Sequence, residues 1–130
     1  MTECIILRHG HSTYNQKGLY TGHADAPLDT LGREQARQLT LQLADTRVDA
    51  IYASDLCRAV ETVRPTADRL GLDIRTDKAL REVDMGAFTG LPYAEVQASF
   101  PAEYAAFCAE RRNIHLRHQT PPVGWLSWYG

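Results

Sequence analysis

The sequence predicts an α/β fold with a mostly parallel sheet, and three observations support this prediction. Short apolar runs alternate along the chain with longer segments whose apolar residues recur at helical spacing. The first run, Cys4–Leu7, is continuously apolar, as expected for a strand that is buried on both faces of a parallel sheet. The length of 130 residues corresponds to one domain. An order of alternating strands and helices within one domain indicates the α/β class.

The first helix is expected after a long polar segment, Gly10–Asp29. A loop of this length in a compact domain is usually either functional or disordered. Asp29 or Thr30 can cap the helix, and leucines and alanines then follow at helical spacing as far as Ala44.

The second strand and the second helix follow directly. The segment Asp49–Ser54 reads DAIYAS and predicts a buried strand. Ser54 and Asp55 can then cap a helix that ends at Gly71. Pro65 lies inside this helical pattern and should kink the helix or split it.

Weaker signals complete the predicted fold. Asp73–Thr76 is expected to form a third strand, and Leu80–Leu91 is a loop punctuated by glycines. Two further helices are expected at Tyr93–Phe100 and Ala102–Arg111.

Composition and charge exclude several classes of function. The net charge of −2 gives no general attraction to nucleic acid or to an anionic membrane. No apolar run has the length of a membrane span, and the N-terminus lacks the pattern of a secretory signal. The cysteines, Cys4, Cys57 and Cys108, lie far apart without zinc-like spacing, and each is interpreted as a small buried hydrophobe. A reduced, cytoplasmic setting is therefore expected.

Polar and charged side chains follow the ends of the predicted strands. Arg8–Asn15 follows the first strand, Ser54–Arg58 follows the second, and the third leads into Glu82. Ligands of open α/β sheets bind outside the carboxyl ends of the strands, so the three segments are expected to converge on one pocket. That pocket would contain two arginines, a histidine and a carboxylate.

This set of side chains suits phosphoryl transfer. Arginine presents a planar fork that matches phosphate oxygens, and a neutral imidazole can attack phosphorus when an acceptor holds its other nitrogen. A carboxylic acid can protonate the leaving alkoxide and then act as a base toward water. Arginines can neutralise the developing charge, so this chemistry requires no metal.

Four stretches of the chain resemble the histidine phosphatase superfamily, which includes the cofactor-dependent phosphoglycerate mutases. They read LRHGHSTYN, GHADAPLDTLGREQA, YASDLCRAVETV and LREVDMGAFTG, and they keep the order and spacing of the family. The first is similar to the family signature of Arg-His-Gly followed by Glu or His and then Thr or Ser. The resemblance implies a three-layer α/β/α, phosphoglycerate mutase-like fold.

The resemblance also implies a role for individual residues. His9 would be the nucleophile that becomes phosphohistidine, with Arg8 and Arg58 as phosphate clamps and Glu82 as the proton donor. No cofactor and no metal are implied. Further positions that match contacts to phosphate or substrate are Asn15, Thr21 and Gly22.

The C-terminal strands of the family are not matched. The second essential histidine of the family lies on a late strand, and neither His115 nor His118 stands in that sequence context. We interpret residues 1–112 as a partial histidine phosphatase domain and residues 113–130 as a tail that does not match the family. A natural truncation, a frameshift and a deliberately shortened chain are all compatible with this ending. Without the neighbouring strand, Cys4–Leu7 would be an exposed apolar edge, which a homo-oligomer or the tail could cover.

The predicted function is metal-independent hydrolysis of a phosphomonoester through phosphohistidine at His9, weak in this chain because the second histidine is absent. The expected partner is a small phosphorylated metabolite or inorganic phosphate, with similarity to the α-ribazole and broad-specificity phosphatases. The alternatives are mutase-type phosphoryl transfer, a non-catalytic phosphate-binding remnant, and a fragment without function. His11 and His23 are interpreted as surface residues or residues at the rim of the pocket.

Overall fold

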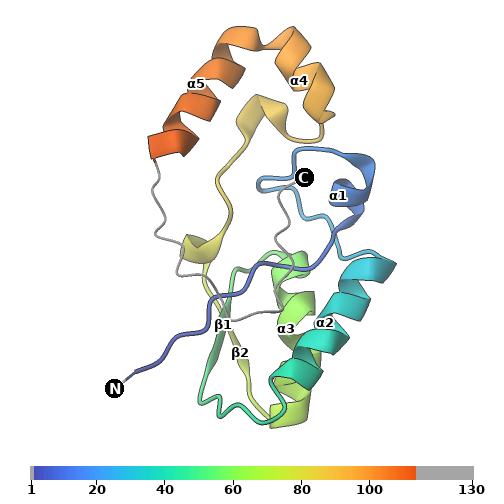
Figure 1. The fold of residues 1–130 in the computed structure, drawn as a ribbon, viewed down its shortest axis with the longest axis vertical. Coiled ribbons are helices and arrows are strands. Elements are labelled where there is room, and N and C mark those ends of the chain that lie inside the picture. Colours follow the sequence, from blue (N-terminus) through green and yellow to red (C-terminus); the bar gives the residue numbers. More distant parts are fainter. Residues whose placement is uncertain (1, 114–130) are drawn as a thin grey trace.

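The structure is a computed structural model that describes residues 2–113 (Figure 1). From residue 30 onward, its helices and strands follow the order that the sequence predicts, with two additional 3₁₀ turns. Between residues 2 and 29, the predicted first strand is absent and one additional short helix is present. No helix in this range is long and apolar enough to cross a membrane. The elements are α1 (Thr13–Lys17), α2 (Thr30–Gln42), β1 (Ile51–Ala53), α3 (Cys57–Leu70), β2 (Ile74–Thr76), the 3₁₀ turns η1 (Lys78–Leu80) and η2 (Gly86–Phe88), α4 (Tyr93–Ser99) and α5 (Pro101–Asn113).

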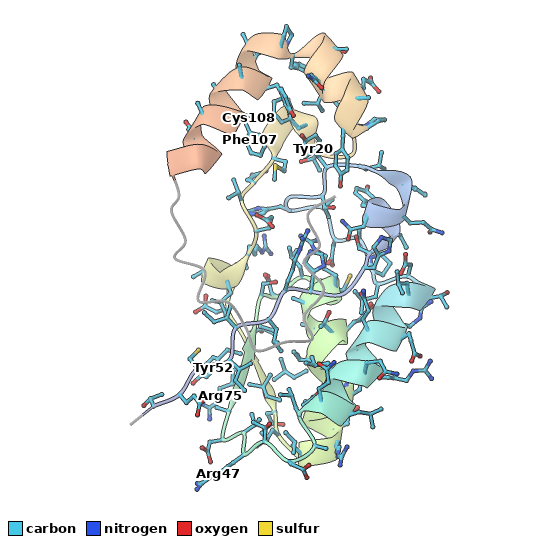
Figure 2. All side chains as sticks on the ribbon, viewed as in Figure 1. Tyr20, Arg47, Tyr52, Arg75, Phe107 and Cys108 are labelled. Carbon is cyan, nitrogen blue, oxygen red and sulfur yellow. The ribbon has the colours of Figure 1, made fainter. Side chains whose placement is uncertain are left out.

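The sheet consists of β1 and β2, which pair in parallel with Ile51 opposite Ile74. Helix α3 contacts both strands, and α2 packs on α3 (Figure 1). Ile51 and Ala53 are buried, whereas Tyr52 alternates to the other face of the sheet and is 60% exposed. Arg75 donates a hydrogen bond to the Tyr52 hydroxyl at 2.9 Å on that open face (Figure 2). The described residues thus supply the parallel sheet and one of its helical layers.

The α/β fold class is confirmed, but the predicted first strand is not formed. Cys4–Leu7 has no strand pairing with any described residue, and Ile6 is 89% exposed. A strand needs a partner for its backbone N–H and C=O groups, and no partner is supplied between residues 2 and 113. The interpretation of Cys4 as a buried residue is also wrong, because Cys4 is exposed.

The start of α3 differs from the prediction as well. Neither Ser54 nor Asp55 caps this helix, because the N-cap residue is Leu56, which has no side-chain capping bond. Instead Asp25, from a distant loop, accepts a hydrogen bond from the Cys57 N–H at 2.7 Å. That bond lowers the pKa of the Asp25 carboxyl and supplies negative charge at the positive end of the helix.

The sequence predicts a kink or a split at Pro65, and α3 continues through Pro65 as one element, so the helix is not split. The helix contacts both strands and α2, and we attribute its continuity to this packing, which compensates for the missing proline N–H. The predicted end at Gly71 is confirmed, because this glycine adopts the left-handed conformation with φ of 64°.

A second cluster of packed side chains, with Tyr20 and Phe107 half-buried, lies among α4, α5 and the loop after α1. Tyr20 meets Phe107 edge-on, and the two rings lie together below α4 and α5 (Figure 2). The Tyr20 N–H donates to the Leu91 carbonyl, and the Gly90 N–H donates back to the Tyr20 carbonyl at 2.8 Å. These bonds anchor the loop after α1 beside the segment that follows Glu82, although the two are far apart in the sequence.

Candidate active site

The backbone around His9 is fixed by glycines and by a buried hydroxyl. The Gly10 N–H donates to Thr62 Oγ1 at 2.8 Å, and that hydroxyl donates to the Arg58 carbonyl at 2.6 Å. A Cβ at Gly10 would lie 2.9 Å from the carbonyl oxygen of Gly32 in α2, so only glycine fits without movement. Helices α2 and α3 thus hold the turn that carries His9.

The tautomer of His9 follows from its hydrogen bond. His9 Nδ1 lies 2.7 Å from the Gly10 carbonyl oxygen. A carbonyl oxygen can only accept, so Nδ1 carries the proton and Nε2 of the neutral ring keeps its lone pair. The ring is therefore oriented for attack through Nε2.

Burial keeps His9 neutral. Burial is the largest cause of a lowered His9 pKa, and the positive charges of Arg58 and Arg8 lower that pKa further. The Gly10 carbonyl and the negative charge of Glu82 act in the opposite direction but do not prevail. The structure thus brings Arg8, Arg58 and Glu82 close enough to His9 for their charges to act on its ring.

Arg58 is almost completely buried, with 2% of its surface exposed. Its guanidinium donates to the Ala24 carbonyl and to the Gly22 carbonyl, both at 2.8 Å. Burial lowers the pKa of Arg58, but a guanidinium stays charged at neutral pH. These two bonds use two of its five N–H groups.

Glu82 is exposed, and its backbone is held from two sides. The neighbouring Arg81 donates to both carboxylate oxygens of Asp55 at 2.6 Å, which ties this segment to the residues before α3. His23 Nε2 donates to the backbone carbonyl of Glu82 at 2.8 Å. The Glu82 carboxylate itself accepts a hydrogen bond from the Val83 N–H at 3.1 Å.

Three further residues, Asn15, Thr21 and Gly22, were predicted to contact phosphate or substrate, and their surroundings differ from those of His9. Asn15 closes a capping box at the start of α1, where its Oδ1 accepts from the Ser12 N–H at 3.0 Å. Thr21 begins the turn that contains Gly22, and its carbonyl accepts from the Ala24 N–H at 2.9 Å. Gly22 accepts a hydrogen bond from Arg58 through its carbonyl, whereas within residues 2–113 no hydrogen bond joins Asn15 or Thr21 to His9. Their contacts to substrate therefore stay predictions.

Sequence reasoning missed three parts of this site. Asp55 was interpreted only as a helix cap, His23 only as a surface or rim residue, and Arg81 was not singled out. Each of these residues is hydrogen-bonded to a residue far away in the sequence, so no local sequence pattern indicates the bond. His11 is also more than a rim residue, because its Nδ1 lies 2.6 Å from Asp29 Oδ2 beside the start of α2. Within the described range, no group of three or more His, Cys, Asp and Glu residues could hold a metal ion.

Replacing His9 with asparagine is expected to remove a pH dependence of stability. Below the ordinary pKa of 6.5, the unfolded chain takes up a proton that the folded chain resists, because the folded pKa is lowered. The wild-type chain should therefore lose stability as the pH falls from 6.5 toward that lower pKa, and His9→Asn should lose less. Urea unfolding from pH 7.5 to 5.5 measures the difference, and parallel curves would contradict a lowered pKa.

Comparison with known proteins identifies relatives of this chain. The model of the histidine phosphatase superfamily, branch 1, matches residues 4–120. Phosphoglycerate mutase-like protein 4 of Arabidopsis thaliana is 34% identical over 116 residues, which is 88% of this chain and 50% of that protein.

Two solved structures share the fold. The α-ribazole phosphatase of Shigella flexneri superposes with a TM-score of 0.72 at 32% identity, over 80% of this chain and 52% of that one. A mycobacterial glucosyl-3-phosphoglycerate phosphatase in complex with inorganic phosphate gives a TM-score of 0.67 at 33% identity, over 76% and 45%. The chain thus spans about half the length of the proteins that it matches. With a family match that covers most of its residues, this chain belongs to the histidine phosphatase superfamily, branch 1.

Proposed function

We propose that this chain hydrolyses small phosphomonoesters through a phosphohistidine at His9, without a metal. The observation that carries the proposal is the hydrogen bond from His9 Nδ1 to the Gly10 carbonyl, which leaves Nε2 as a nucleophile. The charges of Arg8 and Arg58 act on the same ring, where they would neutralise a phosphoryl group. Two similar solved structures, an α-ribazole phosphatase and a glucosyl-3-phosphoglycerate phosphatase with bound inorganic phosphate, support this substrate class.

The chemistry has two steps. In the first, Nε2 of His9 attacks phosphorus, the bond from phosphorus to the ester oxygen breaks, and Glu82 protonates the departing alkoxide. In the second, the Glu82 carboxylate takes a proton from water as the water oxygen attacks phosphorus. The bond between phosphorus and Nε2 then breaks, which releases inorganic phosphate and restores neutral His9.

Glu82→Gln is expected to slow substrates according to their leaving group. An alkyl phosphate needs a protonated leaving oxygen, so its rate should fall by about a hundredfold or more, within the usual range for general acid catalysis. An aryl phosphate releases a stable phenolate and should lose far less. Initial rates on both substrates, in the presence of a metal chelator, provide the measurement. Equal losses on the two substrates would remove Glu82 from the role of acid.

Weak activity is expected for the polypeptide of residues 1–130. The resemblance implies a second histidine that would donate a hydrogen bond to the phosphoryl oxygens, and loss of one such donor slows other enzymes by about a hundredfold. The exposed, unpaired segment Cys4–Leu7 also supports His9 poorly, and catalytic geometry tolerates little displacement.

The comparison uses a chimera in which residues 1–113 continue into the matching C-terminal half of a branch 1 relative. On the same aryl phosphate, kcat/KM of the chimera should exceed that of the short chain by about a hundredfold or more. Equal values would show that no further histidine is needed. Phosphate binding by the short chain without formation of a phosphoenzyme would instead support the second candidate, a phosphate-binding chain that does not catalyse.

A further inference from the structure

The tripeptide Gly22–Ala24 is hydrogen-bonded to the Arg58 side chain and to the main chain of Glu82, the two residues that supply the phosphate clamp and the acid in the proposed reaction. Two of its carbonyls, those of Gly22 and Ala24, accept hydrogen bonds from the buried Arg58 guanidinium. The side chain between them, His23, donates from Nε2 to the Glu82 carbonyl at 2.8 Å. The same three residues are therefore bonded to the phosphate clamp on one side and to the proton donor on the other.

Close packing holds the tripeptide near the segment that follows Glu82. Gly22 has a positive φ of 49°, and a Cβ at this position would lie 2.7 Å from the Met85 backbone nitrogen. Only glycine lets the tripeptide approach the segment after Glu82 so closely. His23 Nδ1 also lies 3.8 Å from Asp84 Oδ2, so the imidazole faces two neighbouring residues of that segment.

We propose that His23 is a positioning residue that sets the place of the Glu82 carboxyl relative to the phosphate held by Arg58. This inference rests on the proposed function and deepens it. The bond goes to the main chain of Glu82 itself, whereas the nearby bond between Arg81 and Asp55 holds the preceding residue. His23 thus fixes the residue that carries the acid, and Arg58 keeps its own two carbonyl partners when the imidazole is removed.

This geometry predicts a selective defect. Loss of the imidazole should impair proton donation to poor leaving groups without weakening phosphate binding. The His23 side chain is 37% exposed, so its replacement leaves no buried cavity and the fold should tolerate it.

Three substitutions distinguish the effect of losing the hydrogen bond from the effect of changing the volume of the side chain. His23→Gln places an amide N–H at about the reach of Nε2, whereas His23→Asn reaches only as far as Nδ1. His23→Leu removes every donor. His23→Asn and His23→Leu should therefore behave alike, and His23→Gln should restore the wild-type properties.

The first measurement is amide hydrogen exchange, which requires no turnover. Exchange in residues 82–88 should accelerate at least fivefold in His23→Asn and His23→Leu, and it should stay near wild type in His23→Gln. Wild-type exchange in all three variants would overturn the proposal. A uniform acceleration across α2 and α3 would also overturn it, because it would show a merely structural role.

The second measurement is the rate of phosphoenzyme formation on His9 in a single turnover, from an alkyl and from an aryl phosphate. The ratio of the alkyl rate to the aryl rate should fall at least fivefold in His23→Asn and His23→Leu and recover in His23→Gln, with an unchanged Kd for inorganic phosphate. An unchanged ratio with normal labelling of His9 overturns this inference alone. No label on His9 in the wild-type chain overturns the proposed function, and with it the catalytic role of His23.

Discussion

His9→Asn is expected to abolish formation of a phosphoenzyme. The amide cannot replace Nε2 as a nucleophile, so no acid-labile phosphate should form from an activated aryl phosphate. Removal of the nucleophile slows other enzymes by about 10⁶-fold, so turnover should fall to background. Mass spectrometry under neutral conditions should find a phosphate on His9 in the wild-type chain and none in the variant.

His11→Asn provides the matched control. His11 lies two residues from His9, and its Nδ1 is paired with Asp29 Oδ2 at 2.6 Å. It should keep a phosphate on His9, even if loss of the pair with Asp29 reduces stability. A label that persists in His9→Asn would assign the nucleophile to a different residue.

Arg58→Met is expected to eliminate phosphate binding and to reduce both turnover and stability. Arginines that stabilise a transferring phosphoryl group are worth about 10³-fold or more in rate. The substitution also leaves the carbonyls of Gly22 and Ala24 without their donor, at about 1–3 kcal/mol for the buried Gly22 carbonyl and less for the half-buried one of Ala24. Calorimetric titration with phosphate and urea unfolding measure the two effects.

Arg64→Met is the control for this experiment, because Arg64 lies on the same helix but is exposed. It should bind phosphate like the wild-type chain and unfold within about 0.5 kcal/mol of it, as usual for surface substitutions. Normal phosphate affinity in Arg58→Met would place the anion elsewhere. Arg58→Lys should not restore binding, because an ammonium cannot span two carbonyls and a phosphate as a planar fork does.

The sequence correctly predicted the elements whose signals, such as helix caps, lie within a few residues of one another. The Asp29 side chain accepts from the Gly32 N–H at the start of α2, as a capping residue should, and Gly71 ends α3. Caps and helical spacing act over a few residues, so the sequence itself contains them. The roles assigned to Arg8, His9, Arg58 and Glu82 depend on the family resemblance and stay predictions.

The errors concern features that depend on a partner far away in the chain. Cys4–Leu7 has the composition of a buried strand, but composition does not supply the neighbouring strand that would pair with it. Asp55 lies one residue before the N-cap of α3 and pairs with Arg81, whereas Asp25 accepts the hydrogen bond at the start of the helix. His115 and His118, the candidates for a second histidine, lie outside the described residues.

The sequence by itself determined the fold class, the order of helices and strands from residue 30 onward, and the supply of an imidazole, two guanidinium groups and a carboxyl after predicted strands. Only the tertiary structure decided how these groups are used. Arg58 finds its carbonyl partners 36 and 34 residues away, and His23 reaches Glu82 across 59 residues. The neutral state of His9 likewise depends on burial by distant segments. Local preference fixes backbone conformation over a few residues, whereas burial and long-range hydrogen bonds exist only after the chain has packed.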